Sequence, residues 1–126
     1  MTEAAARRIV EYLRDRVGRE LRTVVIVREA DWEIYYLRDD LQREYTRESF
    51  GEVVDHFQLD APEQPPDVAE WPVGERRGVV HYHETAFVVQ FPVSDTESIL
   101  ISLTPEVGQD LLAFMEACRN LIEDDG

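Results

Sequence analysis

The first third of the chain has the pattern of one helix followed by two strands. Over residues 3–17 the apolar side chains recur at the spacing of one helical face, and Gly18 follows at the position of a C-terminal cap. Residues 21–27 are rich in β-branched side chains and apolar on both sides, which predicts a strand covered on both faces. The polar segment 29–31 separates it from a second strand at 32–37, so we expect a hairpin.

A second helical pattern extends over residues 39–58, with Asp39 as its N-cap. Thr46 and Gly51 are two positions at which this helix can divide. Residues 59–75 then hold four prolines among acidic residues, which predicts a long loop. Within it, Trp71 either packs the loop against the body or presents an apolar side chain to a partner.

The C-terminal half predicts three more strands and a last helix. Residues 78–83 and 86–91 flank a turn of two residues, as in a tight hairpin. The next strand, 98–103, places alternate side chains on opposite faces. Thr104 then stands before a proline as the N-cap of a helix that runs to about Ile122.

The elements therefore follow the order α-ββ-α-βββ-α, with no internal repeat. We expect an α/β fold of the α+β type, in which a five-stranded antiparallel sheet has helices on both faces. The length of 126 residues fits one domain over 1–126 that includes the long Pro-rich loop at 59–75.

The charge balance bears on the salt concentration to which the protein is adapted. The chain has 27 acidic residues against 13 basic ones, a net charge of -14, and all of the basic residues are Arg. Such a charge repels itself in dilute buffer, whereas at molar salt the Debye length falls to about 3 Å and the repulsion largely disappears. We therefore expect a salt-adapted, halophilic protein; the alternative is an ordinary acidic protein that lacks Lys.

The same composition disfavours several functions. Nucleic-acid binding needs clustered cations, and carboxylates interleave with the Arg-rich stretch of residues 7–22. No apolar run approaches the length of a membrane span, and no secretory signal is present, so we expect a cytoplasmic protein without membrane contact. Cys118 cannot form an internal disulfide, because it is the single cysteine, and it fits the apolar face of the last helix.

His81 and His83 are the candidate metal ligands. They lie two residues apart on a predicted strand and so project from one face, the spacing of a strand-borne metal site. A site needs three or four ligands, and no other His or Cys is in reach along the sequence, so both can instead be structural. Pairing across the tight turn places the histidines with Gln90, Ser98, Leu100 and Ser102, and it places Val80, Tyr82, Phe87 and Val89 on the opposite, core-like face.

No other pattern indicates chemistry. The six glycines are scattered and form no phosphate-binding loop, and the serines lack a nucleophile elbow. Adjacent carboxylates are too common in so acidic a chain to indicate general acid–base catalysis. We therefore expect no catalytic residue and no cofactor.

The element order, and the strand Val24-Val25-Ile26-Val27 followed by a turn and Trp32-Glu33-Ile34, resemble the roadblock/dynein-light-chain domains of profilin-like architecture. The Asp-Gly common at that turn is replaced by residues 29–31, and the 59–75 loop is longer. The chain also looks like the small acidic haloarchaeal families that have no assigned function. The resemblance implies a dimerising scaffold or a regulator of a small GTPase, without catalysis of its own.

The last helix has a wider apolar stripe than one sheet contact requires. The stripe is either shared between the sheet and the first helix or forms part of a homodimer seam. The expected partner or dimer surface comprises Phe50, Val54, Phe57, Trp71, Leu112, Met115 and Ile122.

Three function hypotheses follow from these features. The first is a non-enzymatic protein-interaction or regulatory module, a homodimeric scaffold. The second is a small-ligand sensor, and the third is a metal-dependent enzyme that uses His81 and His83. In the second, the pocket would be lined by Trp32, Tyr35, Trp71 and Tyr82.

Overall fold

In the computed structural model, the described residues are 2–60, 70–110 and 120, with the side chains of 58–60 excepted. They form three α-helices, five strands and two short 3₁₀ turns. The helices and turns are α1 (Thr2–Val17), η1 (Gly18–Glu20), α2 (Asp39–Glu44), α3 (Arg47–Asp60) and η3 (Pro105–Gly108). The strands are β1 (Leu21–Arg28), β2 (Trp32–Leu37), β3 (Val79–Tyr82), β4 (Phe87–Pro92) and β5 (Glu97–Leu103).

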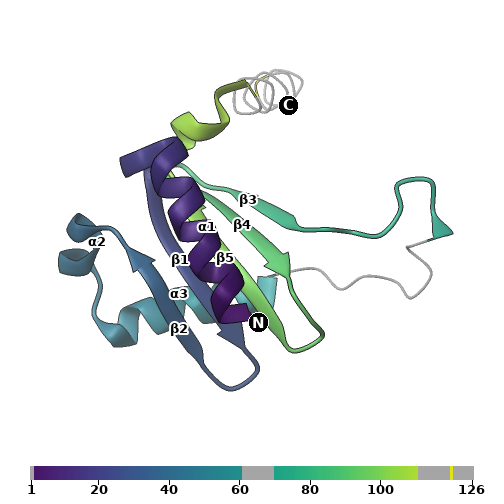
Figure 1. Cartoon of the computed structure of the whole chain (residues 1–126), viewed down its shortest axis with the longest axis horizontal. Coiled ribbons are helices and arrows are strands. Elements are labelled where there is room, and N and C mark those ends of the chain that lie inside the picture. Colours follow the sequence, from purple (N-terminus) through teal and green to yellow (C-terminus); the bar gives the residue numbers. More distant parts are fainter. Residues whose placement is uncertain (1, 61–69, 111–119, 121–126) are drawn as a thin grey trace.

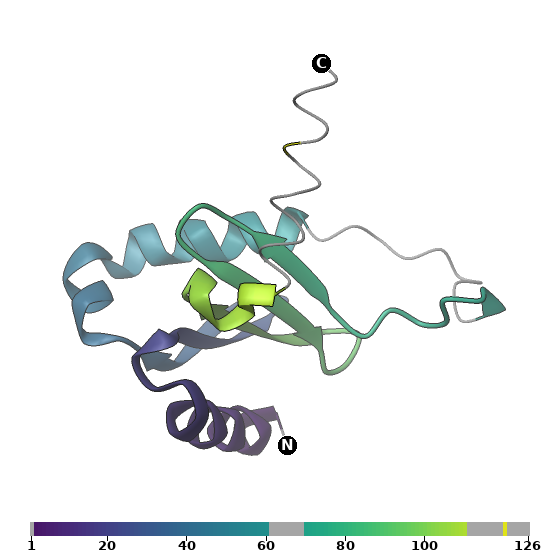
Figure 2. The same ribbon diagram turned by 90° about the horizontal axis from the view of Figure 1, so that it is seen from above.

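The five strands form one antiparallel sheet in the order β2-β1-β5-β4-β3. Helix α1 lies on one face and α3 on the other, as Figure 2 shows with the sheet between them. The predicted α+β class, with helices on both faces of a five-stranded antiparallel sheet, is confirmed. Strand β1 pairs with β2 on one side and with β5 on the other, so it links the N-terminal hairpin to the three C-terminal strands (Figure 1).

Each face of the sheet has its own apolar core. Under α1 the buried cluster consists of Ala6, Leu21, Val24, Ile26, Ile99 and Ile101. Under α3 it consists of Val25, Val27, Phe50, Val54, Phe57, Val88 and Leu100. Strand β1 contributes alternate residues to both clusters, which confirms that its doubly apolar sequence is covered on both sides.

The boundary between α2 and α3 lies at Thr46, one of the two predicted positions. The hydroxyl of Thr46 accepts a hydrogen bond from the Ser49 N–H at 3.0 Å, and the Ser49 hydroxyl accepts one from the Thr46 N–H at 2.9 Å. This reciprocal pair satisfies the free donors at the start of α3 in the manner of a capping box.

The division predicted at Gly51 is wrong, since this residue lies inside α3. The ring of Trp32 on β2 packs against it, and a Cβ atom at residue 51 would lie 3.4 Å from that ring. The helix therefore continues through Gly51, which lies beside the Trp32 ring and marks no break.

After β5 the chain forms η3, in which the Val107 N–H donates to the Thr104 carbonyl at 3.2 Å. Thr104 precedes this turn in extended conformation but makes no side-chain cap hydrogen bond. Gly108 packs on Phe87 of β4, so η3 lies on the α1 face of the sheet. Most of the predicted last helix, Cys118 included, lies outside the described residues.

We predict that Gly18→Ala destabilises the protein. Gly18 ends α1 with φ of 56°, a left-handed conformation that costs an L-residue about 1 kcal/mol. No atom lies within 4 Å of an added Cβ, so the loss comes from backbone strain alone. Urea unfolding in molar KCl measures the change, and an unchanged midpoint contradicts the left-handed cap.

We expect Gly51→Ala, in contrast, to stabilise the protein. Alanine is favoured over glycine inside a helix by roughly 1 kcal/mol, and its methyl group would meet Trp32 at an ordinary contact distance of 3.4 Å. The same unfolding assay should show a higher midpoint than wild type. A lower midpoint would mean that α3 and β2 pack more closely than the structure has them.

Candidate functional site

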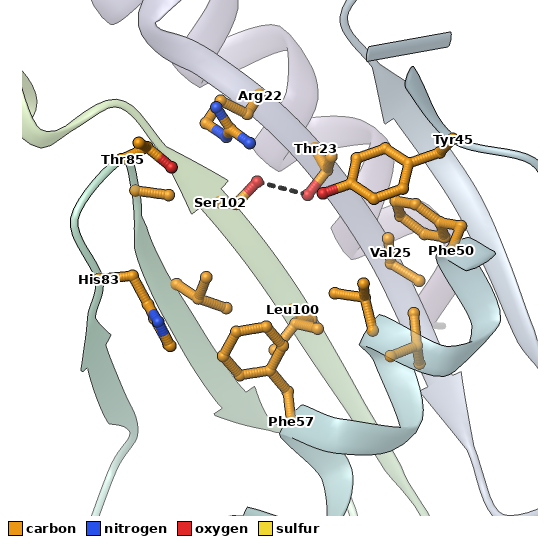
Figure 3. A pocket seen from close by; sticks show the side chains of 14 residues that line it. Arg22, Thr23, Val25, Tyr45, Phe50, Phe57, His83, Thr85, Leu100 and Ser102 are labelled. Carbon is orange, nitrogen blue, oxygen red and sulfur yellow. Dashed lines mark hydrogen bonds between the residues drawn. The ribbon is translucent and has the colours of Figure 1, made fainter. Parts of the chain in front are cut away.

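A cavity of about 190 Å³ lies between α3 and the sheet (Figure 3). Its floor is formed by side chains of the sheet, among them Val25, Val88 and Leu100, and its wall by the aromatic side chains Phe50 and Phe57 of α3. This apolar part belongs to the α3-side core. The cavity is therefore a place where α3 leaves the sheet incompletely covered.

The other end of the cavity is polar. It is lined by Arg22, Thr23, Tyr45, His83, Thr85 and Ser102, which come from β1, β5, the segment between α2 and α3 and the β3–β4 turn. Figure 3 shows the guanidinium of Arg22 beside Ser102 and Thr85, across the opening from Phe57. All lining side chains are uncharged or cationic, because neither Asp nor Glu lines the cavity among the described residues.

A local irregularity in β1 brings Arg22 to this face. Adjacent residues of a regular strand point to opposite faces, yet Arg22 and Thr23 both line the cavity. The pairing of β1 with β5 shifts register between Leu21 and Thr23, which is the signature of a β-bulge. A bulge re-aims one side chain, and here the side chain is an arginine.

The Nε atom of Arg22 is buried and has no hydrogen-bond partner among the described residues. A second such atom is Oγ1 of Thr104, whose N–H donates to the Glu20 carbonyl at 2.8 Å and so lies at the same end of the sheet. Leaving a buried polar atom unpaired costs about 1–3 kcal/mol. Of the two residues, Arg22 lines the polar end of the cavity and Thr104 does not line the cavity.

Thr23 and Ser102 form a buried hydrogen bond of 2.7 Å between their hydroxyl groups, across the β1–β5 pair. Each hydroxyl has one hydrogen, and one of the two is used in this bond. The accepting hydroxyl keeps its own hydrogen for another acceptor. The polar end of the cavity thus holds a hydroxyl donor beside the guanidinium of Arg22.

The two candidate metal ligands, His81 and His83, lie on the face of the sheet that α3 covers. His81 Nε2 lies 3.4 Å from Gln90 Oε1, and the rings of His81 and His83 contact the ring of Phe57 edge-on at centroid distances of 5.0 and 5.4 Å. The predicted pairing of His81 with Val88 and the shared face with Gln90 and Ser102 are confirmed. Within the described part of the chain, no group of three or more metal-ligating side chains is present.

Part of the predicted partner surface is core instead. Phe50, Val54 and Phe57 are 5%, 1% and 7% exposed, because their face of α3 packs against the sheet. The expectation that they form an external seam is therefore wrong for this chain. Trp71 is 44% exposed in a turn closed by the Gly74 N–H on its carbonyl. Leu112, Met115 and Ile122 lie outside the described residues.

The aromatic pocket predicted for a ligand sensor is also wrong. Trp32 packs on Phe50, Tyr35 belongs to the α1-side core, and Tyr82 packs on Phe87. None of these, nor Trp71, lines the cavity under α3. The residues that do form its polar end, Arg22 and Thr23 above all, were missed. The sequence feature that could have indicated them is a pair of polar residues at the start of an otherwise apolar strand.

A second feature is the incompletely covered half of the α1 face. Val80, Tyr82, Val89 and Phe91 lie on that face beyond the reach of α1, and we name this set the open half-face. Val80 is 52% and Phe91 42% exposed, so the expectation of a buried core is wrong at Val80. Residues 70–78 lead away from the sheet before β3 begins, as Figures 1 and 2 show, and the side chains of Trp71 and Val73 on this segment are exposed.

The family model described as a domain of unknown function (DUF7522) matches residues 7–123, nearly the whole chain, so the chain belongs to that family. No curated protein and no solved structure matches the chain. Among the described residues, no helix is long and apolar enough to cross a membrane.

We predict that Arg22→Met stabilises the protein without ligand by about 1 kcal/mol. Methionine keeps an apolar stem of similar length and removes the unpaired buried donor. Urea unfolding measures the difference, and Arg8→Met, an exposed position on α1, is the matched control with a change near zero. A loss of stability at residue 22 that exceeds the control would show that the guanidinium is paired in solution.

Proposed function

We propose that this member of the DUF7522 family is a non-enzymatic protein-interaction module that works as a homodimer. The observation behind the proposal is the open half-face beside β3, where Val80 and Phe91 are exposed; Trp71 and Val73 on the segment before β3 are exposed as well. Contiguous exposed apolar surface on a soluble protein marks an interaction site.

The edge of the sheet at β3 favours a second copy of the chain as the occupant. Natural edge strands carry charges or irregularities that oppose further pairing. Strand β2, at the other edge, has Glu33 and a register shift in its pairing with β1. Strand β3 has the sequence Val-Val-His-Tyr, with no Asp, Glu or Arg to oppose an added strand.

The proposal extends to the domain type. The order α-ββ-α-βββ, with α1 and α3 on opposite faces, supports a roadblock-like or profilin-like assignment. A protein partner such as a small GTPase would then bind the dimer, in a salt-rich cytoplasm suited to the net charge of -14. The assignment predicts regulation by surface contact rather than by catalysis.

Light scattering after size exclusion tests the dimer. In 2 M KCl we expect a mass of twice the 14.7 kDa of one chain. In 0.1 M KCl the two protomers, each with a net charge of -14, should separate, since the Debye length rises to about 10 Å. Circular dichroism at both salts shows whether the chain stays folded.

The seam itself is tested with the double variant Val80→Arg and Phe91→Arg. Both side chains are exposed in the single chain, so charge should abolish the dimer and leave the fold intact. Tyr12→Arg, at a 58% exposed position on α1, is the control that should remain dimeric. A wild-type monomer at 2 M KCl, or a double variant that still dimerises, overturns the proposal.

A second candidate function, a small-ligand sensor, is favoured by the cavity under α3. Its polar end and apolar wall are those of a ligand site, in which a few placed polar groups orient a molecule on an apolar surface. The two functions are compatible, because the cavity and the open half-face lie on opposite faces of the sheet.

A further inference from the structure

We propose that the cavity under α3 binds a small monocarboxylate with a compact apolar body, and that Arg22 binds its carboxylate. The proposal rests on the second candidate function and names its ligand class. Arg22 lines the polar end of the cavity, and its buried Nε has no hydrogen-bond partner among the described residues, which is the observation that indicates a missing anionic partner.

The surroundings of Arg22 differ from those of two arginines that form ion pairs, Arg28 and Arg38. The chain has more than two carboxylates for each arginine, 27 against 13, and other guanidiniums are bound by them. Arg28 makes ion pairs with Glu3, Asp31, Glu33 and Glu97, and Arg38 makes one with Asp40. Arg22 has no ion-pair partner among the described residues, and no carboxylate lines its cavity. Arg22 differs from exposed arginines such as Arg8 and Arg43, because its Nε is buried beside a cavity that no carboxylate lines among the described residues.

The other polar groups fit an anion as well. The Thr23–Ser102 pair keeps one hydroxyl hydrogen after its own hydrogen bond of 2.7 Å, and Thr85 lies at the same end of the cavity (Figure 3). A planar carboxylate can accept two parallel hydrogen bonds from a guanidinium and one from a hydroxyl. The site can therefore bind a carboxylate entirely with donors.

The volume and the wall determine the rest of the ligand. A cavity of about 190 Å³ holds a molecule of small size, and Phe50, Val54 and Phe57 form an apolar wall for its body. A free phosphate would bring up to two charges to a single arginine and would leave the aromatic wall unused. In a branched short-chain acid or in benzoate, the carboxylate matches the polar end of the cavity and the apolar body matches its wall.

Titration of ¹⁵N-labelled protein in 2 M KCl tests the proposal, with the probes isobutyrate, benzoate, benzyl alcohol and inorganic phosphate. Benzoate is expected to shift the amides of Thr23, Ser102 and Thr85 and to bind at least tenfold more tightly than benzyl alcohol, its neutral analogue. Chloride competes with the anionic probes for Arg22 but not with benzyl alcohol, so the measured preference for benzoate is a lower bound.

Arg22→Gln should reduce benzoate affinity at least tenfold and leave the weak binding of benzyl alcohol unchanged. Arg8→Gln removes the same charge from the other face of the sheet and should bind benzoate like wild type. Arg22→Lys should restore only part of the affinity, because lysine lacks the two-pronged geometry.

Three results would overturn the proposal: no carboxylate binds, phosphate binds more tightly than benzoate, or both glutamine variants lose affinity equally. Direct binding is separable from the sensor function, which requires in addition that benzoate changes the dimer population in light scattering. Binding without that change supports the site and contradicts the sensor. An unoccupied cavity leaves the homodimer proposal, tested at the open half-face, unaffected.

Discussion

The fold depends on the burial of β1 on both of its faces. Val24 and Ile26 point to one side and Val25 and Val27 to the other, and all four are at most 4% exposed. A strand of this kind cannot lie at a solvent-exposed face, so helices must cover the sheet on both sides. Helix α1 supplies one cover and α3 the other. Both candidate sites are places where this cover is incomplete: the cavity under α3, and the open half-face beyond α1.

The use of Arg in place of Lys fits the packing as well as the composition. Guanidiniums of Arg7, Arg14 and Arg47 lie 5.7, 5.5 and 4.7 Å from the ring centroids of Tyr35, Tyr36 and Trp32. A planar guanidinium stacks on aromatic faces and keeps its hydrogen bonds, whereas an ammonium is more strongly hydrated. These contacts join the helices to β2 through cation–π pairs that molar salt screens less than exposed ion pairs.

Arg28 and Arg22 stand at opposite ends of the same strand and show two uses of one residue type. Arg28 collects carboxylates from α1, the first hairpin and β5, with side chains that are 26–69% exposed. Pairs so exposed add little stability individually, and their value lies in balancing local negative charge. Arg22 is turned inward by the bulge and meets no carboxylate among the described residues. We expect its unpaired Nε to cost stability in the free protein, which is typical of a group that serves binding.

Local patterns predicted the order of the described helices and strands of this protein. The helix at 3–17, the hairpin at 21–37, the helix boundary at Thr46 and the register of His81 with Val88 follow from local patterns, because the spacing of apolar side chains and turn chemistry act within a few residues.

Tertiary structure decided which apolar faces became core and which stayed open. The apolar stripe of Phe50, Val54 and Phe57 would have the same sequence pattern against a sheet as against a partner. Only the position of α3 on the sheet shows that these residues are core. The cavity was likewise beyond the sequence, since it needs a bulge that turns Arg22 and a strand 79 residues away that places Ser102 against Thr23. Such contacts depend on the packing of the whole sheet, and no local pattern contains them.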